Sequence, residues 1–146
     1  MRRYAWIILV TLLSACGWLG DRRLSGPERA ALQWAEEYFN FQLERSAQHA
    51  TPESMRWLQF AASNISDADI DAVRSSDYAV EVEALGNDAP EADSLTVVRI
   101  EVRNAFLPKD IGNGVEAVKR ATFAIPMKKR DGRWMVHLSS VPRPLP

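Results

Sequence analysis

Residues 95–104 read LTVVRIEVRN, and two kinds of side chain alternate along them. One side of an extended chain would carry the mostly apolar set Thr96, Val98, Ile100 and Val102. The other side would carry Val97 and the charged set Arg99, Glu101 and Arg103. A period of two residues is that of a β-strand with one face buried and the other in water. This stretch therefore predicts a strand of an antiparallel sheet with one covered face and one polar face.

Strand character is also present in three other segments: residues 78–85, residues 118–127 and residues 133–141. In the first of them Glu81 and Glu83 share one side, and we expect them to pair across strands with the charged side chains of the stretch above. Asp131 and Gly132, directly before the last segment, are typical of a hairpin turn. We therefore expect a sheet of about four strands.

The first half of the chain has helical spacing instead. Ser25 is followed by Pro27 and then by Glu28, three residues after Ser25, which is the pattern of a capping box at a helix start. Apolar side chains recur at helical spacing from there to Arg45. We predict one helix over this whole run, with an apolar stripe wide enough to cover a sheet.

Two shorter helices are predicted after it. Thr51, followed by a proline, caps the second, and Ser66 caps the third, in which Ile70 and Val73 face inward. Helices that come first and strands that come after predict an α+β fold. The length of 146 residues fits one domain with a single core.

The N-terminus has the features of a secretory signal. Two arginines follow Met1, and residues 4–13 (YAWIILVTLL) have no charge. Ten residues span about 15 Å as a helix, which is too short for a hydrocarbon core of about 30 Å. Small residues, Ser14 and Ala15, then precede a predicted cut after residues 1–15. An N-terminal anchor helix or a buried core helix is the alternative.

Residues 13–16, Leu-Ser-Ala-Cys, resemble the bacterial lipoprotein lipobox, in which the signal is cut before the cysteine and lipid is attached to it. The resemblance implies that Cys16, the only cysteine of the chain, carries lipid that anchors the protein in a membrane. Residues 16–26 would then be the lipidated cysteine and a tether. Gly17, where an aspartate would imply inner-membrane retention, favours the outer membrane of a Gram-negative envelope.

Order and lengths of the elements resemble the nuclear transport factor two-like (cystatin-like) superfamily, and within it small bacterial lipoproteins. The shared features are the lipobox, the aromatic first helix (WAEEYFNF), the Thr-Pro start of the second helix and the last hairpin (MKKRDGRWMVHL). The resemblance covers residues 27–141, with residues 142–146 as a tail. It implies N-terminal helices packed on a curved antiparallel sheet, which together form a cone.

Composition argues against several kinds of function. A formal net charge of -1 gives no reason to expect nucleic acid, and one cysteine excludes an internal disulfide or a multi-thiolate zinc site. Asp67, Asp69 and Asp71 lack the glycine and the last carboxylate of a calcium loop, so we interpret them as acids at a helix start. His49 and His137 lie in different elements, and we interpret each as having local partners. We predict no metal, no cofactor and no catalytic residue.

Aromatic residues are the remaining feature. We predict an apolar pocket between the first helix and the sheet, edged by Trp34, Tyr38, Trp57 and Trp134. It would take a small amphipathic or lipid-like molecule, or an apolar residue of a partner protein. The alternative is that these side chains fill one another's space as core.

These observations together predict a membrane-anchored lipoprotein of the bacterial cell envelope that acts as a non-enzymatic binding or assembly module. Its partners would be the membrane, through Cys16, and a small ligand or an envelope protein. The superfamily also contains isomerases and cyclases with an Asp base or an Asp–His pair, so an enzyme with the same fold is the alternative. A structural subunit of an envelope complex is a third possibility.

Overall fold

This computed structural model describes residues 23–88 and 94–146. The predicted signal at residues 1–15 and the predicted lipid-bearing Cys16 lie outside the described residues, as does most of the tether. No helix within the described ranges is long and apolar enough to cross a membrane.

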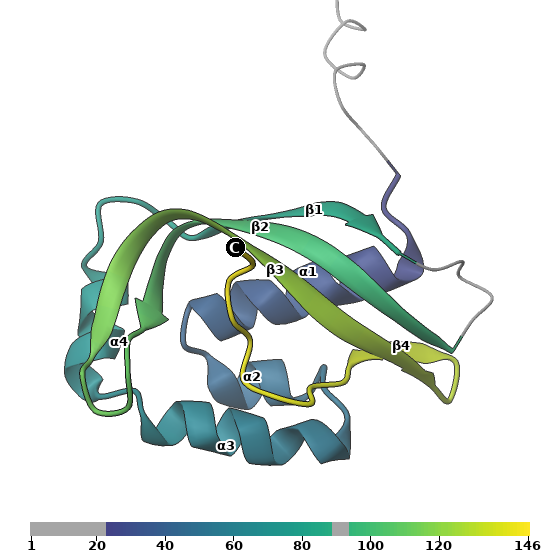
Figure 1. Ribbon diagram of the computed structural model, residues 1–146, viewed down its shortest axis with the longest axis horizontal. Coiled ribbons are helices and arrows are strands. Elements are labelled where there is room, and N and C mark those ends of the chain that lie inside the picture. Colours follow the sequence, from purple (N-terminus) through teal and green to yellow (C-terminus); the bar gives the residue numbers. More distant parts are fainter. Residues whose placement is uncertain (1–22, 89–93) are drawn as a thin grey trace, which may run out of the picture.

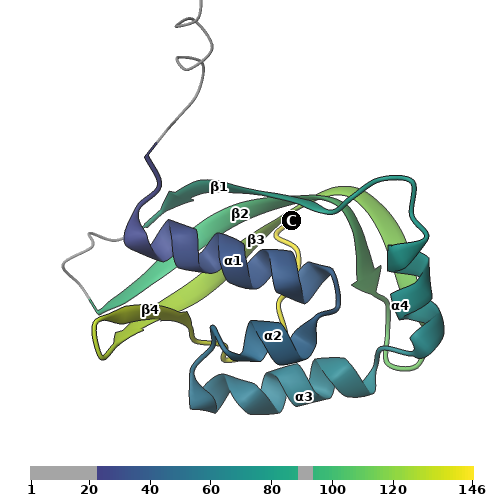
Figure 2. The ribbon, with the colours of Figure 1, turned by 180° about the vertical axis from the view of Figure 1, so that it is seen from behind.

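One antiparallel sheet of four strands forms the second half of the chain, in the order β1-β2-β3-β4. The strands are β1 (Glu81–Asn87), β2 (Leu95–Pro108), β3 (Val115–Arg130) and β4 (Arg133–Val136). The long strands β2 and β3 arch over the helices in both views of the molecule (Figures 1 and 2). The predicted α+β class is therefore confirmed, with helices packed on a curved antiparallel sheet.

Alternation along β2 is as predicted: Thr96, Val98, Ile100 and Val102 are all buried. On the outer face Arg103 forms ion pairs with Glu83 at 2.7 Å and with Glu81 at 3.6 Å. The predicted pairing of these glutamates across strands is thereby confirmed. Arg99 pairs instead with Asp88, at 2.9 Å, just beyond the end of β1.

The predicted last strand at residues 133–141 is too long, because β4 ends at Val136. The following residues still run along β3, but with only scattered bonds to it. The backbone N–H of His137 donates to the carbonyl of Pro126 at 2.8 Å, and that of Leu145 donates to the carbonyl of Thr122 at 2.7 Å. The C-terminal residues therefore lie along the edge of β3 without forming a regular ladder.

The first helix, α1 (Gly26–Phe39), begins with the predicted capping box between Ser25 and Glu28. It does not reach Arg45 as predicted. The side-chain amide of Asn40 donates to the carbonyl of Glu36 at 2.7 Å, which is the acceptor that a continued helix would use for the backbone N–H of residue 40. The chain then turns, and a separate short helix, α2 (Leu43–Ala47), follows.

The region predicted as the second helix starts with a 3-10 turn, η1 (Pro52–Ser54), which leads into α3 (Met55–Ser63). Thr51 is the N-cap residue of η1 as predicted, but its side chain makes no capping hydrogen bond. The third helix, α4 (Asp67–Arg74), begins at the cap predicted at Ser66, which forms a capping box with Asp69. No residue of α4 is fully buried, so this helix lies loosely at one end of the molecule (Figure 1).

The core lies between α1 and the concave face of the sheet. Trp34 and Phe39 of α1 are at most 2% exposed, and the ring of Phe39 lies 4.8 Å from that of Phe123 on β3. Ile100 and Ile125, from the two central strands, are completely buried beside them. Burying a large apolar side chain contributes about 1.5–3 kcal/mol, so this layer supplies most of the stability of the domain.

Candidate functional site

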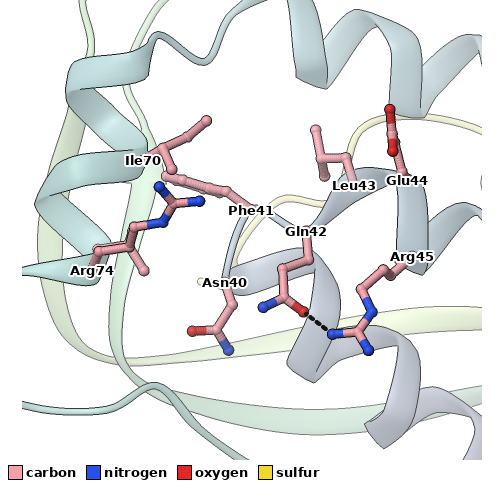
Figure 3. A pocket seen from close by; sticks show the side chains of 9 residues that line it. Asn40, Phe41, Gln42, Leu43, Glu44, Arg45, Ile70 and Arg74 are labelled. Atoms are coloured by element: carbon pink, nitrogen blue, oxygen red, sulfur yellow. Dashed lines mark hydrogen bonds between the residues drawn. The ribbon is translucent and has the colours of Figure 1, made fainter.

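A pocket of about 550 Å³ opens where the end of α1 meets α4. Its lining comes from two segments: Asn40, Phe41, Gln42, Leu43, Glu44 and Arg45 from the turn into α2, and Ile70, Val73 and Arg74 from α4. We call it the cone-mouth pocket. Figure 3 shows it from close by, with Phe41 directed toward Ile70 across the opening. Its volume falls within the range of small-molecule sites.

The backbone of the turn explains why Phe41 lies in the pocket. The N–H of Phe41 donates to the carbonyl of Tyr38, and the N–H of Gln42 donates to the carbonyl of Glu37, which together make a Schellman motif at the end of α1. The residue after the cap in this motif is left-handed and is usually glycine, but here it is Phe41, with φ of 57°. A left-handed non-glycine residue costs about 1–2 kcal/mol.

The lining has two chemical characters. Apolar surface comes from the half-buried side chains of Phe41, Leu43, Ile70 and Val73. Positive charge comes from Arg45, whose guanidinium donates to the Gln42 amide oxygen at 3.2 Å, and from Arg74. Within residues 23–88 and 94–146, Arg74 has no ion pair or side-chain hydrogen bond. The pocket therefore fits a molecule with an apolar body and an anionic end, although Glu44 lies at its rim.

Trp34 and Tyr38, two of the four aromatic residues predicted to edge a pocket, lie deep in the core. Their rings stack with centroids 4.6 Å apart, and both residues are buried. Burial raises the pKa of the Tyr38 phenol well above its ordinary value, because the charged form would lose its hydration.

The other two lie elsewhere. Trp57 is on α3, with the guanidinium of Arg56 4.8 Å above its ring, and Trp134 is on β4 close to Gly26. The cone-mouth pocket is lined by none of the four. Among the described residues the indole nitrogens of Trp34 and Trp57 are buried without a hydrogen-bond partner. The aromatic pocket stays a prediction.

The two histidines have different partners in different parts of the fold. A hydrogen bond of 2.8 Å joins the Nδ1 of His137 to the hydroxyl of Thr51. The Thr51 hydroxyl also lies 2.9 Å from the hydroxyl of Ser54. Both hydroxyls are completely buried, and that of Ser54 accepts the N–H of Leu138 and donates to the carbonyl of Val136. We call this group, Thr51, Ser54 and His137, the hydroxyl clasp. It ties η1 to the end of β4.

His49 lies in a different place, with its Nε2 3.4 Å from a carboxylate oxygen of Glu37. This contact is an ion pair when the imidazole is protonated, and neither residue lines the cone-mouth pocket. Within the described ranges no group of three or more His, Cys, Asp or Glu side chains could hold a metal ion. Asp69 is used by the capping box of α4, with its carboxylate accepting from the N–H and the hydroxyl of Ser66.

Sequence reasoning missed the cone-mouth pocket because it treated residues 27–45 as one helix. In a continuous helix Phe41 would join the apolar stripe and no hollow would form. The available signal was Asn40, since asparagine often ends a helix. Ile70 and Val73 were expected to face inward, but they line the pocket and neither is fully buried.

Comparison with known proteins gives a match among solved structures only. No protein-family model matches the sequence, and a search of curated proteins found no match. The chain is similar to a solved structure described as an "Ntf2 like protein involved in plasmid conjugation", with a TM-score of 0.37 and 11% identity. The alignment covers 81% of this chain and 47% of the other, so the chain spans about half the length of that protein. At this TM-score the likeness bears on neither function nor partners, and the fold class rests on the sheet and helices described above.

Proposed function

We propose that the protein is a membrane-anchored lipoprotein of the bacterial cell envelope. Its domain would act as a non-enzymatic module that binds a small amphipathic anion in the cone-mouth pocket. The observation that supports this best is the strained turn at Phe41. Strain that the surrounding structure maintains is more often found at functional sites than elsewhere, and here it directs an aromatic ring into a hollow.

The composition of the pocket supports an amphipathic anion over a purely apolar ligand. Four apolar side chains would contact the body of such a molecule, and Arg74, at the end of α4, would meet its charge. A carboxylate that a guanidinium binds with two bonds is held more firmly than a neutral polar group. A neutral apolar molecule would leave this cation without a partner.

Laurate and the neutral dodecanol are suitable probes for the domain from residue 24 onward. We expect laurate to bind and to raise the thermal midpoint, and Arg74→Gln to weaken laurate binding roughly tenfold or more, since hydrogen bonds to charged groups contribute about 1.5–3 kcal/mol. Arg133→Gln, a matched change on the distant hairpin, should leave binding unchanged. If laurate does not bind, or if both variants behave alike, the pocket is not the binding site.

Anchoring is a separate part of the proposal and rests on the lipobox-like sequence ending at Cys16. Growth with a radioactive fatty acid should label the wild-type chain, and Cys16→Ser should abolish the label and leave an uncut or soluble form. A label that survives the substitution would contradict lipidation at this residue.

The enzyme alternative also has a direct test. Glu37 and His49 are the carboxylate–histidine pair of the described residues, at 3.4 Å. If a compound that binds the domain is converted to a product, and Glu37→Gln abolishes the conversion while binding persists, then the module is an enzyme.

A further inference from the structure

The point where the tether enters the domain lies beside the last hairpin. Gly26, the first residue of α1, is packed so closely against Trp134 of β4 that a Cβ there would lie 3.1 Å from the indole ring. In Figures 1 and 2 the start of α1 and β4 are at the same end of the molecule. Cys16 precedes Leu24 by eight residues, and eight extended residues span at most about 29 Å.

Four cations and one carboxylate, Asp131, are concentrated in residues 128–133 at this end, which we call the basic hairpin. Arg130 is neutralised by Glu53, with 2.7 Å between guanidinium and carboxylate. Lys129 lies 5.9 Å from the ring of Trp134. Lys128 and Arg133 have no ion pair within residues 23–88 and 94–146, so their charge is available to an external anion.

An exposed apolar side chain lies beside these cations. Leu95 is 57% exposed, and its strand pairing places it next to Lys128, whose other neighbour is Met135 on β4. Residues directly opposite one another on adjacent strands share a face of the sheet. Leucine, lysine and methionine thus form a row across the outer face of this end, a combination typical of surfaces that meet lipid headgroups.

At the opposite end of the domain, α4 contains three acids and one cation, Arg74. The acids are Asp67, Asp69 and Asp71. A Cβ built on Gly114, in the turn between β2 and β3, would lie 3.9 Å from a carboxylate oxygen of Asp69, so this turn lies beside α4. The cone-mouth pocket is lined by α4 and by the turn from α1 into α2. The 14 residues of α1 separate this turn from the tether by about 21 Å. The molecule is therefore polarised along α1.

We infer that the basic hairpin, with Leu95, rests on an anionic bilayer surface and holds the domain with its cone-mouth pocket facing away from the membrane. This inference rests on the proposed anchoring through Cys16, because the short tether keeps the hairpin close to the surface. Anionic headgroups attract the hairpin and repel α4, and the attraction is screened over about 10 Å at ordinary ionic strength. The tether, which spans at most about 29 Å, lets the hairpin come within this distance.

The test uses the full, lipid-modified chain reconstituted in vesicles of phosphatidylcholine with or without phosphatidylglycerol. A fluorescent label is attached at Leu95→Cys or, as the matched position at the other end, at Ile111→Cys, which is also an exposed apolar residue. A quencher is carried on the lipid headgroups. In vesicles with phosphatidylglycerol we expect strong quenching at position 95 and weak quenching at position 111, and the difference should fall at high salt.

Reversing the charge of hairpin residues tests whether the cations of the basic hairpin cause the preferred orientation. Lys128→Glu with Arg133→Glu should reduce the orientational preference by about fivefold for each cation removed, because a Lys or Arg near an anionic membrane contributes roughly 1 kcal/mol. Lys109→Glu with Lys119→Glu changes the charge equally but away from the hairpin, and should leave the preference intact. Thermal unfolding of each variant confirms that it is folded.

Equal quenching at both positions, or a difference that survives reversal of the hairpin charges, would overturn the inference. A failure of the proposed anchoring is detected separately, because Cys16 would then carry no fatty-acid label. A labelled protein with no preferred orientation would therefore refute the orientation alone.

Discussion

The two ends of the domain are built on different principles. At the tether end the hydroxyl clasp satisfies every polar atom it buries, and backbone bonds of 2.8 and 2.9 Å join residues 49 and 51 to Val136. At the far end α4 buries no residue completely, and the turn before α2 holds Phe41 in a strained conformation beside a hollow. If the cone-mouth pocket is the binding site proposed above, the difference means that stability and binding are separated along α1. The tether end can be rigid because the pocket lies elsewhere.

The largest change in the free energy of unfolding is expected from a substitution in the core between these ends. Trp34→Ala removes a side chain that is completely buried, and we expect the free energy of unfolding to fall by about 3–5 kcal/mol. Urea denaturation measures it. A loss near zero, together with lost ligand binding, would support the aromatic pocket predicted from the sequence. The half-buried Trp57→Ala is the control and should cost less.

The next largest change in the free energy of unfolding is expected from the hydroxyl clasp. Ser54→Ala leaves the buried N–H of Leu138 without its acceptor, and leaving a buried polar group unpaired costs about 1–3 kcal/mol. Ser63→Ala removes an equivalent hydroxyl from an exposed helix end, where water replaces it, and should change the free energy of unfolding by no more than about 0.5 kcal/mol. Equal effects in the two variants would mean that the tether end is no more rigid than the surface.

At the far end Phe41→Gly should separate binding from stability. Glycine adopts the left-handed conformation without strain, and this relief offsets the removal of the half-buried ring, so we expect the free energy of unfolding to change by about 1 kcal/mol or less. Laurate binding should be abolished, as measured by titration calorimetry. A large destabilisation would show that Phe41 is a core residue and would weaken the comparison between the two ends.

The smallest effect concerns the Glu53–Arg130 ion pair. The hydrogen bond from Arg130, followed by a backbone hydrogen bond, lowers the pKa of Glu53 from its ordinary value to about 2. A carboxyl whose pKa is lower in the folded state stabilises the fold above its unfolded pKa, and this contribution is lost as the pH falls toward 2. The pair is exposed, so the effect is small. Arg130→Met should reduce the drop in thermal midpoint between pH 5 and pH 2; an identical drop would contradict the pKa shift.

Much of this fold could be predicted from local patterns. The alternation in residues 95–104 identified the buried face of β2. The capping box at Ser25 and the cap at Ser66 identified the starts of α1 and α4, because the decisive contacts are within a few residues. The hydroxyl clasp could not be predicted in this way. Its members Thr51 and His137 are 86 residues apart, so nothing local distinguishes them from an ordinary cap and a strand histidine.

The candidate site was hidden for a related reason. Phe41 has an apolar side chain at helical spacing, and only the side-chain bond of Asn40 and the two backbone bonds of the turn override that spacing. The pocket then needs α4 to come alongside, which is a matter of tertiary packing. Periodicity in the sequence predicts which face of a helix or strand is apolar. It does not predict a pocket, which forms where two elements are packed with space between them.

The hydroxyl clasp also sets an order of events in folding. Ser54 and Leu138 are 84 residues apart, so their bond can form only when nearly the whole domain is present. Contacts between residues so distant in sequence slow the search for the native state, and during synthesis the N-terminal helices must wait for the last strand. The tether end joins the start of α1, made early by the ribosome, to the last strand, and it is therefore the last part to close. In pulse-labelled hydrogen exchange, the amide of Leu138 should gain protection in the slowest phase.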